Sequence, residues 1–147
     1  MTNDSTMRSL SAADPADRLE LHELYARYCH AIDRNDAETV LALFAPGGGF
    51  HRTRDSAVFG PAASFTGDDG LRRYYTSRPT DRPANQHWVA NLWFDDGGPT
   101  VIGHAAFQII QHAGGRGEIV VFGDYIDELV PTGAGWRFLN RHVELAF

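Results

Sequence analysis

The sequence is poor in the residues that build disulfides, multi-cysteine metal sites and nucleic-acid interfaces. Its 147 residues contain a single cysteine, Cys29, which excludes an internal disulfide and any zinc site made from several cysteines. The net charge is −6, and no basic cluster interrupts the acidic balance. Because binding to nucleic acid or to an anionic membrane surface requires a positive patch, we expect neither kind of partner.

Long apolar runs are also missing. Residues 1–13 are polar and contain no stretch of the length found in signal peptides, and no later segment is apolar over the span of a bilayer. The length of the chain is that of one domain. We therefore expect a soluble cytoplasmic protein in which residues 1–13 form a flexible tail and residues 14–147 form a single domain.

Histidine is plentiful, but its spacing does not suit a metal ion. The seven histidines include no His-x-His pair and no HExxH motif. On a strand that rises about 3.3 Å per residue, His104 and His112 would lie roughly 26 Å apart, so one ion could not bind both. We expect neither a metal nor a cofactor.

The first half of the chain carries the signals of three helices. Asp14 is placed to cap the first helix, Pro15 suits its first position, and Asp17 suits the positive end of the helix dipole. We predict that this helix runs to about Asp33. Its apolar stripe falls at helical spacing and comprises Leu21, Leu24, Tyr25, Tyr28 and Ile32.

Two shorter helices follow the first. Asn35 or Asp36 is placed to cap the helix "AETVLALF", which the glycine-rich "APGGG" ends. Residues 50–65 then predict a short strand and an irregular loop. The third helix is predicted to begin at Thr66 or Gly67.

The pattern changes to strands from residue 85 onward. Four apolar runs are separated by the turn clusters "DDGGP", "AGGRG" and "PTGAG", which predicts a meander of long antiparallel strands. Helices followed by strands indicate an α+β fold, with the helices on one face of a curved sheet.

The stretch "NQHWVANLWF" places His87 and Asn91 on one face of its strand. A turn centred on Asp96 and Gly97 would pair His87 with Ala106, within one residue. The face of His87 would then mix small, apolar and hydrogen-bonding groups, which is typical of a cavity lining. This predicted face comprises His87, Val89, Asn91, Trp93, Ile102, His104, Ala106 and Gln108.

The opposite face of this predicted hairpin is uniformly apolar. Large apolar patches mark interfaces, so we predict a homodimer with Trp88, Leu92 and Phe107 near the contact. In the last hairpin, a turn centred on "TGAG" would place Asp127 opposite Arg141, within one residue, as a structural pair worth roughly 0.2–1 kcal/mol.

Three stretches carry a resemblance to a known family. "LYARYCHAIDRNDAETVLALFAPGGGF", "NQHWVANLWF" and "FGDYIDELVPTGAGWRFLNRHVEL" resemble the SnoaL-like branch of the nuclear transport factor 2-like superfamily, and with the third helix they cover residues 17–145. The resemblance implies a cone-shaped α+β barrel, with three N-terminal helices packed on a strongly curved, mostly antiparallel sheet. The superfamily includes dehydratases, dehydrochlorinases, isomerases, cyclases and non-catalytic subunits, so the resemblance selects no single activity.

The resemblance also implies catalytic residues. Several lyases of this fold use an aspartate at the end of the first helix and a histidine on the strand after the third helix, and Asp33 and His87 occupy those positions. A polar residue five positions before the aspartate often serves the same pocket, and here it is Tyr28. Some members add a histidine or acid on the next strand, for which His104 and His112 are candidates. We expect Asp33 to contact a ring nitrogen of His87 at roughly 2.6–3.2 Å.

Such a pair suits abstraction of a proton from carbon next to a carbonyl. The aspartate would fix the tautomer of His87 and stabilise its imidazolium, while Tyr28 would donate to the developing oxyanion or leaving group. We expect the substrate to be a small apolar or aromatic, polyketide-like molecule. The residues predicted to bind it are Tyr28, Phe50, Asn91, Trp93 and His104.

Each of these roles has a plainer alternative. Asp33 is also a common residue for opening a turn, and Tyr28 is also a core residue at helical spacing. Asn91 and His104 could serve only in hydrogen bonds across the sheet. The function predicted is a cofactor-independent lyase or isomerase. The alternatives are a polyketide cyclase that uses the same pocket and a non-catalytic small subunit of the ring-hydroxylating dioxygenase type.

Overall fold

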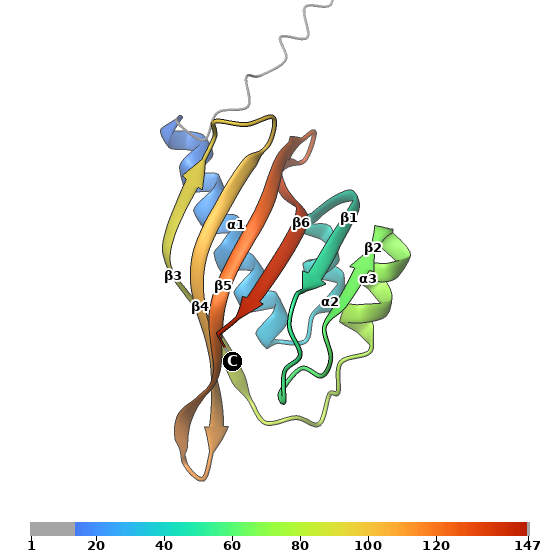
Figure 1. The fold of residues 1–147 in the computed structure, drawn as a ribbon, viewed down its shortest axis with the longest axis vertical. Helices are drawn as coiled ribbons and strands as arrows, with labels where there is room; N and C mark the ends of the chain where they lie inside the picture. The colour runs from blue at the N-terminus through green and yellow to red at the C-terminus, as the bar shows by residue number, and fades with distance from the viewer. Residues whose placement is uncertain (1–13, 147) are drawn as a thin grey trace, which may run out of the picture.

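Three helices lie on one face of a six-stranded sheet in the computed structural model, which describes residues 14–146 (Figure 1). The tail predicted for residues 1–13 lies outside the described residues. The helices are α1 (Pro15–Asp33), α2 (Ala37–Ala42) and α3 (Gly67–Thr76). The strands are β1 (Phe44–Arg52), β2 (Ala63–Thr66), β3 (Asn85–Asp95), β4 (Val101–Ala113), β5 (Arg116–Thr132) and β6 (Gly135–Leu145).

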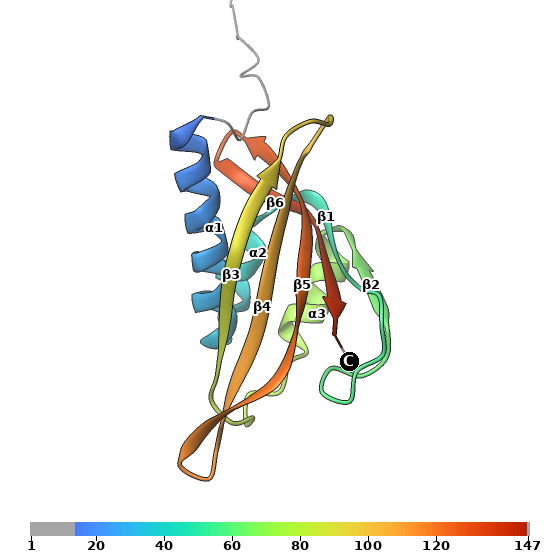
Figure 2. The ribbon, with the colours of Figure 1, turned by 60° about the vertical axis from the view of Figure 1, so that its left-hand side comes forward.

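The sheet is open and mostly antiparallel. Its strand order is β2-β1-β6-β5-β4-β3, and only β1 and β6 pair in parallel. Figure 2 shows the helices on one side of the twisted sheet, with α1 alongside β3. The predicted α+β class and the mostly antiparallel sheet are confirmed.

Helix α1 begins and ends where the sequence predicts. The Asp14 carboxylate accepts a hydrogen bond from the Ala16 backbone N–H at 2.8 Å, Pro15 occupies the first turn, and the helix ends at Asp33. The five residues of its predicted stripe are all buried. This packing brings the end of α1 to the beginning of β3. Among residues 14–146, no helix has the length and apolar character needed to cross a membrane.

The next two helix starts are also confirmed, but strand β1 begins earlier than predicted. Asp36 caps α2 and Thr66 precedes α3, whereas the strand expected after residue 50 begins at Phe44 and includes the glycine-rich segment. A Cβ atom at Gly48 would lie 2.5 Å from the backbone oxygen of Leu139. Glycine therefore permits the close approach of β1 to β6 that the sequence pattern alone did not indicate.

The predicted register of the β3–β4 hairpin is wrong for two reasons. The turn lies further along the chain than Asp96 and Gly97, since Asp95 pairs with Ile102, and strand β3 contains a bulge. His87 pairs with Ile109, three residues from the predicted partner. Asn91 and Leu92 together oppose Ala105, and Asn91 adopts a left-handed backbone with φ of 54°. Because side chains alternate along a strand, one extra residue places the two ends of β3 in opposite phase.

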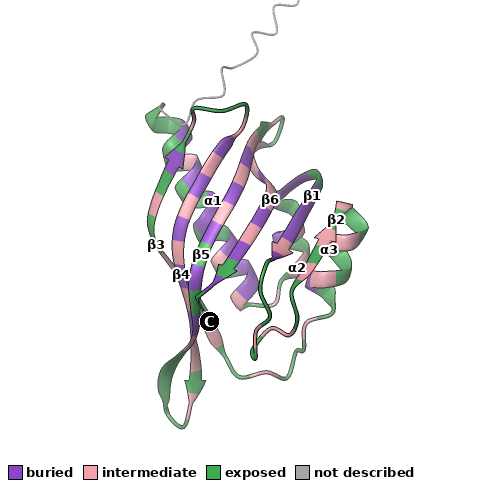
Figure 3. Ribbon diagram, in the orientation of Figure 1, coloured by how far each residue is buried: buried purple, intermediate pink, exposed green. Residues whose placement is uncertain are grey.

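The bulge moves His87 to the helix-covered face of the sheet and separates it from Trp93 and His104. On β4 the buried residues alternate with partly exposed ones, as Figure 3 shows. Phe107 lies on the covered face and is buried, so its predicted place in an outer apolar patch is wrong. Trp93 stacks on His104 on the outer face, with ring centroids 4.2 Å apart, and is 53% exposed.

The predicted pair of Asp127 and Arg141 is confirmed, but it lies in the core. Arg141 Nε and Nη2 donate to the two carboxylate oxygens of Asp127 at 3.0 and 2.7 Å, and both side chains are fully buried. The Tyr25 hydroxyl donates to the same carboxylate at 2.6 Å. The pair therefore belongs with buried ion pairs, whose disruption costs roughly 3–5 kcal/mol, and not with surface pairs.

Candidate functional site

Asp33 and His87 form a buried hydrogen-bonded pair where α1 ends and β3 begins. His87 Nδ1 lies 2.6 Å from Asp33 Oδ1, and the backbone N–H of His87 donates to both carboxylate oxygens at 3.1 and 3.0 Å. The His87 side chain is 5% exposed and that of Asp33 is 18% exposed. Because an ionised carboxylate only accepts, Nδ1 carries the proton and Nε2 remains free to act as a base.

The surroundings of His87 favour its neutral form. Burial lowers the pKa of the imidazole below its usual 6.5, and the positive charges of Arg78 and Arg141 lower it further. The hydrogen bond and charge of Asp33 raise the pKa but do not outweigh burial. His87 is therefore neutral at pH 7, which is the form that can accept a proton.

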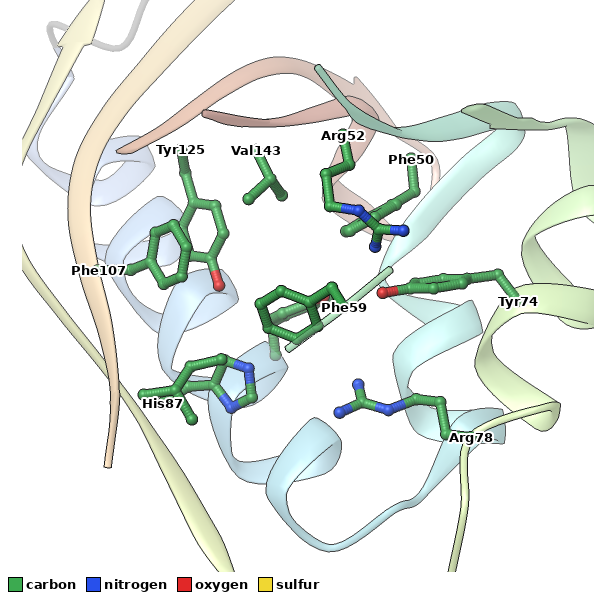
Figure 4. A pocket seen from close by; sticks show the side chains of 11 residues that line it. Phe50, Arg52, Phe59, Tyr74, Arg78, His87, Phe107, Tyr125 and Val143 are labelled. Atoms are coloured by element: carbon green, nitrogen blue, oxygen red, sulfur yellow. The ribbon is translucent and has the colours of Figure 1, made fainter. Parts of the chain in front are cut away.

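His87 borders a narrow pocket between the sheet and the helices (Figure 4). The free space inside is about 20 Å³, and a wider groove of about 340 Å³ adjoins it and shares some of its wall. Phe59, from the loop between β1 and β2, lies in the middle of the pocket in Figure 4. The lining residues are Tyr28, Phe50, Arg52, Phe59, Tyr74, Arg78, His87, Phe107, Ile109, Tyr125 and Val143.

Two tyrosine hydroxyls belong to this pocket. Tyr28 shares a 2.9 Å hydrogen bond with the hydroxyl of Tyr75, and Figure 4 shows the hydroxyl of Tyr125 directed into the space. Burial raises the pKa of Tyr125 well above its usual value, so its hydroxyl stays protonated. The guanidinium of Arg141 lies 4.2 Å from the ring centre of Tyr28 and 3.8 Å from that of Tyr125. The buried ion pair thus supports the wall that carries both hydroxyls.

Two arginines of the pocket wall did not emerge from the sequence as site residues. Arg52, at the end of β1, is 6% exposed, and Arg78 follows the end of α3. Arg52 is buried because it lies two residues after buried Phe50 on β1, so that both side chains point to the same face of the sheet. The sequence did not indicate this face because the beginning of the strand was predicted at the wrong residue. Tyr74, on α3, and Phe59, in the loop between β1 and β2, carry no comparable signal.

The structure brings together only part of the predicted substrate-binding set. Tyr28 and Phe50 line the pocket with His87, whereas Asn91 is exposed and borders a groove between α1 and β3. Trp93 and His104 lie on the outer face, so their predicted place beside His87 is wrong. His112 is exposed near the far end of β4. Within the described part of the chain, no three histidine, cysteine or acidic residues are arranged to hold a metal ion.

The chain is an α+β protein in which a mostly antiparallel sheet, covered by helices, encloses an aromatic pocket with a polar pair. The comparisons identify its family. The SnoaL-like domain family matches residues 14–142, so the chain belongs to this family and the predicted resemblance is confirmed. No sequence match is found among curated proteins.

Solved structures with the same fold differ in their described roles. A protein of unknown function from Mycobacterium tuberculosis is 22% identical with a TM-score of 0.73, covering 90% of this chain and 77% of its own. A candidate scytalone dehydratase from Novosphingobium aromaticivorans is 19% identical with a TM-score of 0.70, covering 90% and 85%. The beta subunit of a candidate aromatic-ring-hydroxylating dioxygenase from the same bacterium is 18% identical with a TM-score of 0.74, covering 93% of both chains.

Proposed function

We propose that the protein is a cofactor-independent lyase or isomerase that removes a proton from carbon next to a carbonyl group. The observation that carries this proposal is the buried pair in which Asp33 holds Nδ1 of His87 at 2.6 Å and leaves Nε2 free. A neutral imidazole in a water-poor aromatic pocket has the properties of a general base. The aromatic walls suit a small apolar or aromatic substrate.

The proposed reaction begins when His87 Nε2 takes the proton and the electron pair of the C–H bond moves toward the carbonyl oxygen. Asp33 stabilises the resulting imidazolium, and the hydroxyls of Tyr28 and Tyr125 donate to the enolate oxygen. Collapse of the enolate with loss of a β-substituent, such as hydroxide or halide, gives a lyase. Return of the proton to another carbon gives an isomerase.

The same pocket supports a cyclase as a second candidate. An enolate formed at His87 would then attack a second carbonyl carbon of the same polyketide-like chain. The interior is too small for the substrate of either a lyase or a cyclase, because the free space of about 20 Å³ holds little more than a water molecule. Substrate entry therefore requires the side chain of Phe59 to leave the centre of the pocket.

Proton abstraction can be tested without knowing the natural substrate. Incubation with α-tetralone, an aromatic ketone, in heavy water should exchange its α-protons for deuterium, followed by proton NMR. His87→Gln should slow the exchange about 10²–10⁴-fold, since it removes the general base. His112→Gln is the matched control, because His112 is exposed and lines neither the pocket nor the adjoining groove. Equal exchange by wild type and His87→Gln would refute the base, and the non-catalytic subunit would become the better interpretation.

We also propose that a second copy of the chain covers the outer face of the sheet, as a homodimer. Trp88 and Trp93 lie on this face and are 55% and 53% exposed, and Phe122 is 47% exposed. Exposed aromatic side chains of this density are typical of interfaces. Sedimentation equilibrium should give twice the chain mass, and Trp88→Glu should shift the protein toward the monomer. A wild-type monomer at micromolar concentration would contradict the dimer.

A further inference from the structure

The wall of the pocket that faces His87 contains positive charge without a matching carboxylate. Arg52 is 6% exposed, and its Nη2 donates to the backbone oxygen of Pro61 at 2.8 Å. Its buried Nε has no hydrogen-bond partner. Within residues 14–146, neither Arg52 nor Arg78 forms a salt bridge. Leaving a buried charged donor unpaired is costly, so a missing ligand is a physical explanation for the arrangement.

The positive charges around this wall also repel one another. Arg82 lies nearby and donates weakly to the backbone oxygen of Ile32. Burial lowers the pKa of the Arg82 guanidinium, and the charge of Arg78 lowers it further, while Asp33 is the carboxylate that opposes this effect. Asp33 is already engaged by three hydrogen bonds from His87. An anion at the mouth of the pocket would relieve this repulsion.

Figure 4 shows how the two guanidinium groups are directed. Those of Arg52 and Arg78 point into the pocket from different segments, and the hydroxyl of Tyr74 points into the same region. Both arginines lower the pKa of Tyr74, while burial raises it, so the two charges lie close to its hydroxyl and the phenol remains a donor. The ring of Tyr74 stacks on Phe50 at 4.5 Å and on Phe65 at 4.6 Å. The donors thus project from an aromatic wall.

We propose that Arg52 and Arg78 bind the carboxylate of an aromatic ligand, and that the substrate of the His87 site is therefore a carboxylic acid. This inference rests on the proposed function, because it assumes that the other end of the ligand reacts at His87. A guanidinium group matches a planar carboxylate with parallel N–H donors, and Tyr74 supplies a further donor. The ligand body then takes the place of the Phe59 ring and reaches from the arginines toward His87 Nε2.

Binding of simple aromatic probes tests this site directly. Isothermal titration calorimetry should show that benzoate binds to the wild-type protein roughly tenfold or more tightly than benzamide, its uncharged analogue. Arg52→Gln and Arg78→Gln should each weaken benzoate binding by roughly the same factor and leave benzamide binding unchanged. Arg54→Gln is the matched control, because Arg54 carries the same charge two residues away and is exposed.

Each outcome of this titration decides the proposal. Benzoate binding that survives both arginine substitutions would overturn it, as would equal binding of benzoate and benzamide. No binding of benzoate at millimolar concentration would also overturn it. Tighter binding of phenyl phosphate than of benzoate would overturn the assignment of a carboxylate. Circular dichroism of the variants excludes unfolding as the cause of lost binding.

The titration also separates this inference from the proposed chemistry. His87→Gln should bind benzoate as the wild type does, because the carboxylate sits at the arginines. If His87→Gln leaves the exchange of α-tetralone unchanged but Arg52→Gln abolishes benzoate binding, the general base fails and the anion site stands. If His87→Gln slows α-tetralone exchange but Arg52→Gln and Arg78→Gln leave benzoate binding unchanged, the proposed anion site is refuted and the general base is supported.

Discussion

Arg141 and Arg52 lie on the same covered face of neighbouring strands, yet their surroundings differ. Arg141 is fully buried, donates twice to Asp127 and is enclosed by aromatic rings. Arg52 is nearly as buried, but the contacts of its guanidinium are uncharged: the backbone oxygen of Pro61, the hydroxyl of Tyr74 and the ring of Phe59. The first cation has its counter-charge within the chain, whereas no carboxylate of residues 14–146 pairs with the second.

This difference separates residues that hold the fold from residues that await a ligand. A buried charge with a carboxylate partner contributes to stability only while the partner is present. A buried charge without a partner destabilises the empty protein and favours a complementary ligand. His87 is neutral but shows the same contrast within one ring, since Nδ1 is hydrogen-bonded to Asp33 and the ring borders the pocket with Nε2 free.

The largest effect is expected at the paired cation. Arg141→Met should lower the free energy of unfolding by about 3–5 kcal/mol, because it leaves the buried carboxylate of Asp127 uncompensated. Urea denaturation followed by circular dichroism measures this loss. Adding Asp127→Asn to Arg141→Met should restore part of the stability. A loss below about 1 kcal/mol in the single variant would break the comparison, since the pair would then resemble a surface pair.

The next largest effect is expected at Asp33, the carboxylate that is hydrogen-bonded to His87. Asp33→Asn should slow α-tetralone exchange about 10³-fold, because it removes the carboxylate that fixes the tautomer of His87. The exchange rate of the wild type should fall as the pH drops through a pKa below 6.5, since burial lowers the pKa of His87. Asp33 raises that pKa, so Asp33→Asn should move the inflection to lower pH. A shift to higher pH would contradict the assigned roles.

A smaller effect is expected from the pocket hydroxyls. Tyr125→Phe should slow exchange by about 10²-fold, because one donor to the enolate oxygen is lost. Tyr75→Phe should slow it less, since the Tyr75 hydroxyl contacts Tyr28 and not the pocket. Steady-state rates on α-tetralone measure both. If Tyr75→Phe has the larger effect, the donor role belongs to Tyr28 and its partner and not to Tyr125.

The smallest effect is expected at the unpaired cation in the absence of ligand. Arg52→Met should change the free energy of unfolding by less than about 1 kcal/mol, because the lost hydrogen bond to Pro61 is offset by relief of an unsatisfied buried donor. The same urea experiment measures it, with Arg54→Met as the exposed control. A loss as large as that of Arg141→Met would show that Arg52 holds the fold and needs no ligand.

Local signals in the sequence account for the helices, and the family resemblance accounts for the Asp33–His87 contact. The cap at Asp14, the apolar stripe and the end of the helix at Asp33 depend on neighbours within a few residues. The contact follows because the fold carries the end of α1 to the start of β3, which the family resemblance implied. The short turn between Thr132 and Gly135 sets the β5–β6 register to within one residue, and a bulge at Leu139 then places Arg141 opposite Asp127.

The bulge at Asn91 could not be read from the sequence. It depends on how β3 curves against β4, and no single residue of "NQHWVANLWF" signals it. A one-residue change inverts the phase of a strand, so His87 was grouped with Trp93 and His104 although the structure separates them. For the same reason, Phe107 was predicted on the outer face of the sheet, although it is buried on the covered face.

By itself, the sequence determined the order and type of most elements, the two ends of α1 and the residue types available for chemistry, because these depend on spacing and composition. Only the tertiary structure decided which of those residues meet. It brought Arg52, from the end of β1, and Arg78, from the segment after α3, to the pocket of His87, and it left Trp93 and His104 outside. Burial and charge pairing are properties of the packed chain, so whether an arginine stabilises the fold or can bind a ligand is settled only when its neighbours are in place.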